Sequence, residues 1–307
     1  MTEKTKNGIA NLTFTFGLML AGMTFINAAH ASDLDANRFQ WNTLTYSATK
    51  FLMSLDTHVH FERSAAETAS AELLSVPEGD AVMPAASEVM KFTLSTEIMG
   101  RHTETSLWMN PDATVLQRNT VRTGKKERFK ALRFLPDSVY TSRSRPANKG
   151  EEGTPYSQWT NTSGNYDEIA AAEQDLPLTK AESLFYLVAA SDLAKVGDTL
   201  IAYVYEEEGT VQVQLKVEEQ VSLKASFIEH SSEGDRKLSE KIDTLRIRVS
   251  ASPYADNTSG AEFEFLGYKG DIDLFLDPQR NVVVQVAGKV DPVGAVTIKL
   301  KEITYSK

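Results

Sequence analysis

A run of basic residues within an otherwise acidic chain offers the clearest chemistry in this sequence. Residues 118–149 carry ten lysines and arginines against two acids, a local charge of +8, while the whole 307-residue chain has a charge of −10. Arg128 and Lys130 share one face of a predicted strand, with Lys125 and Lys126 in the preceding turn. Such a cationic face could bind phosphate or carboxylate groups. A solvated hairpin that discourages edge pairing would show the same pattern.

Aromatic residues follow in a polar stretch of the chain. Tyr156 and Trp159 could stack on sugar rings or close over an apolar ligand. They could equally hold this stretch against a sheet. The candidate ligand-binding residues are therefore Lys125, Lys126, Arg128, Lys130, Tyr156 and Trp159.

Signals for catalysis and metal binding are weak. His58 and His60 share a strand face, but two ligands make a poor metal site. No Gly-x-Ser-x-Gly motif is present, and the Asp271 and Asp273 pair is typical of a solvated strand face. We expect no catalytic residue, metal or cofactor, and we predict that the chain is not an enzyme.

Alternation of apolar and polar residues predicts the strands that must position these groups. It is clearest in the last part of the chain, where Ile272, Leu274 and Leu276 share a face and two further strands follow at 282–286 and 296–300. The sequence predicts other strands over 41–48, 58–61, 89–98, 103–109, 115–121, 128–135, 139–142, 199–205, 211–217, 221–228 and 245–249.

One amphipathic helix is predicted over 179–193. Thr179 and Glu182 fit a capping box, and Leu184, Leu187 and Val188 form an apolar stripe. A short second helix is predicted near 65–74. These elements predict an all-β fold with one or two helices: a strongly curved antiparallel sheet or incomplete barrel, whose concave face the helix partly covers. An apolar cavity beneath the helix would be a binding site.

Two stretches interrupt the strand pattern. Residues 62–88 are rich in Ala, Ser and Glu, and residues 143–178 lack periodicity. Long loops of this kind are usually functional or disordered. We expect both to be insertions in a single β-rich domain over 32–307.

The beginning of the chain has the features of a secretory signal peptide. Lys4 and Lys6 precede an apolar stretch, and residues 29–31 read Ala-His-Ala, which predicts a signal peptide over 1–31 with cleavage after Ala31. A single membrane anchor is the alternative. Because the chain contains no cysteine, it has neither a disulfide framework nor an N-terminal lipidation site. We expect a bacterial periplasmic protein that does not span the membrane after signal cleavage.

Several segments resemble a family of exported bacterial proteins known as domain of unknown function 3108. The similar segments are 183–187, 196–199, 211–217, 270–277, 293–300 and 44–46. At 50–53 the chain has Lys-Phe-Leu-Met where the family has a glycine-rich segment. The resemblance implies a periplasmic β-rich fold and no particular activity.

The favoured function is non-enzymatic binding of a hydrophobic or amphipathic cell-envelope component, either a lipid or an anionic polymer. One alternative is an envelope scaffold or protein-interaction module with an envelope protein as partner. A glycan-acting enzyme is less favoured because no acidic pair is placed for it. The overall negative charge argues against nucleic acid as a partner.

Overall fold

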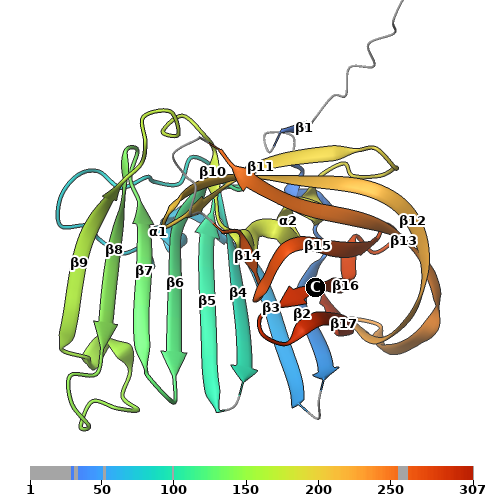
Figure 1. Cartoon of the computed structure of the whole chain (residues 1–307), viewed down its shortest axis with the longest axis horizontal. Helices are drawn as coiled ribbons and strands as arrows, with labels where there is room; N and C mark the ends of the chain where they lie inside the picture. The colour runs from blue at the N-terminus through green and yellow to red at the C-terminus, as the bar shows by residue number, and fades with distance from the viewer. Residues whose placement is uncertain (1–28, 31–33, 51–52, 99, 255–261, 307) are drawn as a thin grey trace, which may run out of the picture.

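The computed structural model describes residues 29–30, 34–50, 53–98, 100–254 and 262–306, and one strongly bent sheet dominates this part of the chain (Figure 1). Its strands are β1 (Ala29–His30), β2 (Trp41–Lys50), β3 (Met53–Ala65), β4 (Glu88–Ile98), β5 (Arg101–Met109), β6 (Val115–Thr123), β7 (Arg128–Phe134), β8 (Ser138–Arg145), β9 (Asn161–Glu168), β10 (Leu178–Thr179), β11 (Thr199–Glu206), β12 (Gly209–Ser231), β13 (Gly234–Pro253), β14 (Glu264–Phe265), β15 (Tyr268–Asp277), β16 (Val282–Val290) and β17 (Gly294–Tyr305). The α-helices are α1 (Ala66–Ser70) and α2 (Leu184–Ala190), and the 3-10 turns are η2 (Ala36–Arg38), η3 (Tyr156–Gln158) and η4 (Ala181–Ser183).

The sheet has an open section and a closed section. Strands β2 to β9 are successive antiparallel neighbours, and we call this section the wall. Strands β12, β13, β15, β16 and β17 form a ring, because β17 pairs both with β16 and with the far end of β12. The 23-residue β12 has a register shift between Val217 and Glu219, and such bulges bend a strand. The predicted curved sheet with partial barrel closure is confirmed.

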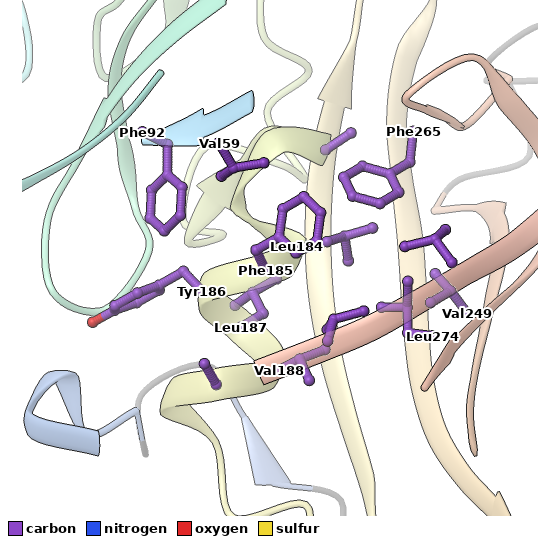
Figure 2. Packing of buried hydrophobic residues seen from close by; sticks show 14 of the residues in the cluster. Val59, Phe92, Leu184, Phe185, Tyr186, Leu187, Val188, Val249, Phe265 and Leu274 are labelled. Carbon is purple, nitrogen blue, oxygen red and sulfur yellow. The ribbon is translucent and has the colours of Figure 1, made fainter. Parts of the chain in front are cut away.

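Helix α2 lies in the interior, between the wall and the ring (Figure 2). All seven of its residues are at most 1% exposed, as expected of a helix that is apolar on every side. The aromatic centroids of Phe185 and Phe265 are 5.3 Å apart, and Phe265 lies next to the closed section of the sheet. The Tyr186 centroid is 6.1 Å from that of Phe92 on the wall. The helix therefore joins the two sections of the sheet into one core.

The helix prediction was right in kind and wrong in detail. The predicted span of 179–193 contains only η4 and α2, and Thr179 belongs to β10 instead. No side-chain hydrogen bond caps either η4 or α2, so the predicted capping box is wrong. The Glu182 carboxylate instead accepts hydrogen bonds from the guanidinium of Arg118 on β6, which the sheet places beside it. The helix is also buried on all sides instead of amphipathic.

Both predicted insertions contain regular structure. In 143–178, β8 continues to Arg145 and β9 follows at 161–168. The residues of β9 are exposed or half-buried, so this strand has no apolar face from which alternation could be recognised. In 62–88, β3 extends to Ala65 and the helix near 65–74 is only the five-residue α1. The segment 221–228, predicted as a separate strand, continues β12 without a break.

The expected signal peptide lies outside the described residues except for Ala29 and His30. These two residues form β1, which pairs in parallel with Leu200 and Ile201 of β11. Cleavage after Ala31 stays a prediction. In the described ranges, no helix combines the length and apolar character needed to cross a membrane.

Candidate anion-binding groove

Basic side chains from neighbouring strands gather on the inner face of the wall. Leu132 of β7 packs in the same core as α2, and Lys130 two residues earlier points to the same face. Lys130 lies opposite Thr120 of β6 and opposite Arg143 of β8. Side chains directly opposite on one face are neighbours. The strand register therefore collects these cations just beyond the apolar core.

A groove of about 660 Å³ opens at this place, and we call it the basic groove. Its size is that of a small-molecule site, although such sites are usually more apolar. Five cations line it against a single carboxylate, which makes it suited to anions. The lining residues are Arg118, Thr120, Arg128, Phe129, Lys130, Arg143, Ser144, Arg145, Asn161, Ser163 and Glu207.

The inner end of the groove is held by a partly buried ion pair. Arg118 donates to Oε1 of Glu182 at 2.9 and 2.7 Å, and to the Thr120 hydroxyl at 2.9 Å. Burial alone would raise the pKa of the Glu182 carboxyl, but the Arg118 guanidinium brings it below its ordinary value. The pair therefore stays ionised and ties the segment before α2 to the wall.

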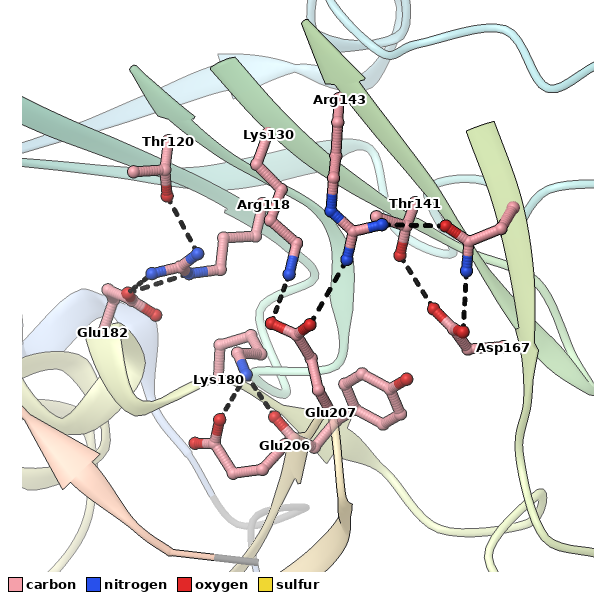
Figure 3. A network of polar contacts seen from close by, with 12 residues as sticks. Arg118, Thr120, Lys130, Thr141, Arg143, Asp167, Lys180, Glu182, Glu206 and Glu207 are labelled. Atoms are coloured by element: carbon pink, nitrogen blue, oxygen red, sulfur yellow. Dashed lines mark hydrogen bonds and ion pairs between the residues drawn. The ribbon is translucent and has the colours of Figure 1, made fainter. Parts of the chain in front are cut away.

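Glu207, in the turn between β11 and β12, reaches Lys130 and Arg143 in the lining of the groove (Figure 3). Its carboxylate binds the Lys130 ammonium and accepts from Arg143 at 3.4 Å. Burial lowers the pKa of Lys130, and the charges of Arg143 and Arg118 lower it further against the opposing effect of Glu207. Arg143 also donates to the Asn165 amide oxygen at 2.9 Å. Glu207 thus pairs with two of the five cations and partly neutralises them.

The outer end has uncompensated charge. Arg128 and Arg145 are exposed and line the groove. Neither forms an ion pair with any residue that the structure describes. The outer end is therefore where an external anion would gain most from binding.

The structure brings together only part of the predicted site. Arg128 and Lys130 line the basic groove, whereas Lys125 and Lys126 are exposed in the turn and are not among its lining residues. Lys126 has a φ of 58°, which is the left-handed conformation of a tight turn. The two turn lysines are thus outside the groove.

The two predicted aromatic residues lie on the opposite face of the wall. Phe129 alternates with Arg128 and Lys130, and it packs with Trp159 in a separate apolar cluster. The Tyr156 ring stacks on Phe129 with centroids 4.2 Å apart and an angle of 3°. Trp159 is 4% exposed. These aromatics therefore fasten the 146–160 segment to the outer face, and they do not contact a ligand in the groove.

The candidate site residues did not include several groups that the structure adds. Arg118, Arg143 and Arg145 belong to the basic segment, and their strand alternation could have placed them with Lys130. Glu182 and Glu207 come from distant parts of the chain, and no local pattern indicated that they would meet these cations.

The other candidate chemistry is explained by local contacts. His60 and His58 are exposed on β3, and their Nδ1 atoms lie 3.2 and 3.3 Å from the hydroxyls of the facing threonines on β2. Asp271 and Asp273 both bind Arg248. Among the residues described, no cluster of three or more His, Cys, Asp or Glu side chains could hold a metal ion.

The expected apolar cavity beneath the helix is occupied by the protein itself. Aromatic and aliphatic side chains surround α2 on both sides (Figure 2). Four surface pockets in the described part of the chain are lined by residues of elements other than α2. The geometry therefore favours binding on the polar inner face over binding inside the core.

Comparison with known proteins identifies no family for this chain. No family model and no curated protein matches this chain, so the resemblance to domain of unknown function 3108 stays a prediction. A solved structure described as a beta-barrel-like protein of domain of unknown function DUF1849 from Brucella abortus is similar over 87% of this chain and 98% of its own. The sequence identity is 10% and the TM-score is 0.39. The chain's own topology defines it as an all-β protein with a curved, partly closed sheet and a helix buried in its core.

Proposed function

We propose that this chain is an exported, non-enzymatic protein of the bacterial periplasm that binds the anionic part of a cell-envelope component in the basic groove. The observation that carries the proposal is a groove with five cations and one carboxylate in a chain whose overall charge is −10. Because the chain as a whole is acidic, we expect an anion to bind at this concentration of cations in preference to other places on the surface.

The signal-peptide pattern of residues 1–31 supports the location. In an envelope, phosphate and carboxylate groups occur on lipid headgroups and on polymers, and these groups share the chemistry that arginine and lysine bind. A ligand with an apolar part would keep that part outside the core, since α2 fills the interior.

A second candidate function is an envelope scaffold that pairs with a partner strand. In the described structure β9 pairs with β8 on one side only and ends the wall. An open edge presents backbone donors and acceptors to which an extended segment of another protein can add. Crosslinking in cells distinguishes this role, because recovery of one protein partner independent of anions supports it.

The proposal is tested by calorimetric titration of the purified exported chain with pyrophosphate and with phosphatidylglycerol vesicles at low ionic strength. The double variant Lys130→Gln, Arg143→Gln leaves the Glu207 carboxylate without its partners, so we expect at least tenfold weaker binding. The matched control Lys237→Gln removes an exposed lysine on β13 and should bind as the wild type does. Equal loss in the control, or no binding of either probe, contradicts the proposal.

A further inference from the structure

Three arginines lie on consecutive strands near the outer end of the groove, two of them in its lining and the third, Arg122, beside it. Arg122 of β6 pairs directly with Arg128 of β7. Phe129 pairs with Ser144, so the same register brings Arg128 opposite Arg145 of β8. We call Arg122, Arg128 and Arg145 the arginine row. It runs across the strands on the inner face of the wall.

The arginine row has no counter-charge of its own. None of its three members forms an ion pair or a side-chain hydrogen bond with a residue in the described ranges, although Lys130 and Arg143 beside it do. The Nε atom of Arg122 is buried without a hydrogen-bond partner. Burial, together with the charges of Arg128 and Arg101, lowers the pKa of the Arg122 guanidinium. Facing like charges are destabilising, so an anion bound here would relieve a repulsion that the folded chain maintains.

The spacing and direction of the row favour an extended ligand. Neighbouring strands lie about 4.8 Å apart, so three adjacent arginines repeat a positive charge along a line. At about 660 Å³, the groove is far larger than one ion needs, since a water molecule has a share of about 30 Å³. Asn161 and Ser163 add uncharged polar groups to its lining, and these could bind hydroxyl or backbone oxygens between the charges.

The shape of the site argues against a flat membrane surface. The groove lies on the inner face of a bent sheet, and Glu207 extends over it from the β11–β12 turn (Figure 3). A flat bilayer surface cannot follow the inner face of this bend. A single flexible chain can enter the groove from its outer end.

We propose that the basic groove binds a linear polyanion, a polymer with a phosphate or carboxylate on successive units, which lies across β6, β7 and β8 with its charges on the arginine row. This inference rests on the proposed function and specifies its ligand class. Lys130 and Arg143, already paired with Glu207, contribute a second line of charge beside it.

The test measures affinity against chain length. Pyrophosphate, tripolyphosphate and long-chain polyphosphate are titrated into the wild type, Arg128→Gln, Arg145→Gln and the control Lys237→Gln, with polygalacturonate as the carboxylate-bearing polymer. We expect each row variant to bind the long chains about fivefold to tenfold more weakly, and pyrophosphate only about twofold to threefold more weakly, because a short anion contacts fewer charges of the row. The slope of log affinity against log salt should fall by about 0.7 to 0.9 for each arginine removed. A long polymer offers many overlapping binding positions, which raise the apparent affinity of the wild type and of every variant by the same factor. The affinity of each variant relative to that of the wild type is therefore the quantity to compare.

The outcomes separate this inference from the proposed function. If pyrophosphate binds and depends on Lys130 and Arg143, but chain length and the row variants have no effect, the polymer assignment is wrong and the anion-binding function stands. Vesicles of phosphatidylglycerol that bind through the row as tightly as the polymers would assign the site to a lipid surface instead. If no anion binds, both proposals fail.

Discussion

At the scale of single residues, the pair of Arg118 and Glu182 shows how much the groove depends on buried charge. Their side chains are 22% and 12% exposed. Removing one member of such a pair leaves the other charge uncompensated, which costs about 3 to 5 kcal/mol. We expect Glu182→Gln to lower the free energy of unfolding by about 3 kcal/mol in urea titrations.

Glu262→Gln is the matched control, because Glu262 is an exposed partner of Lys269 and surface pairs add little. It should leave the urea midpoint almost unchanged. A similar loss in both variants would show that burial of the Arg118 pair is not the cause.

The pair's contribution to stability depends on pH in a way that follows from the direction of the Glu182 pKa shift. Arg118 holds the pKa of Glu182 below its ordinary value against the opposing effect of burial. The stabilisation is therefore complete above the unfolded pKa of about 4.5 and is lost as the pH falls through the lower folded value. The difference in unfolding free energy between wild type and Glu182→Gln should shrink below this pH.

At the scale of elements, α2 depends on its surroundings for its stability. A seven-residue helix is too short to be stable alone in water, so packing against the wall and the ring must stabilise it. Leu187 is 0% exposed in the middle of the helix. We expect Leu187→Ala to lower the free energy of unfolding by about 2 to 5 kcal/mol in urea titrations, because it leaves a cavity where both sections of the sheet meet.

Val196→Ala provides the comparison for α2, since Val196 is 57% exposed just beyond the helix. We expect Val196→Ala to change the free energy of unfolding very little. If Leu187→Ala were as mild as Val196→Ala, the helix would not be the element that joins the two sections.

At the scale of the whole molecule, ring closure depends on a short junction between β12 and β17. Residues 228–230 pair in parallel with 302–304. Glu229 is 5% exposed and accepts hydrogen bonds from Arg236, Arg280 and Tyr305 at this junction. The network ties β12 to the β15–β16 turn and to the end of the chain.

We expect Glu229→Gln to weaken the junction because it removes the charge that both arginines bind. Amide hydrogen exchange of 228–230 and 302–304 should become faster, while anion binding in the basic groove is retained. Glu240→Gln, an exposed position on β13 of the same hairpin, should leave exchange unchanged. Loss of groove binding together with faster exchange would mean that the ring and the wall unfold as one unit.

Most strands could be predicted from the sequence because alternation is a local property. The strands over 199–206 and 282–290 show an apolar face within their own residues, and the structure contains both. β9 could not be recognised, since an edge strand with two solvated faces has no such pattern. The capping-box prediction failed for a related reason: a local fit at Thr179 and Glu182 lost to a stronger partner 64 residues away.

The sequence by itself determined a basic segment and, through strand alternation, that Arg128 and Lys130 share a face. Only the tertiary structure decided which face that is, that Tyr156 and Trp159 lie on the other, and that Glu207 covers part of the groove. The physical reason is the range of each interaction. Side-chain direction along a strand depends on the adjacent backbone, whereas the partner of a charge depends on how distant strands pair and bend.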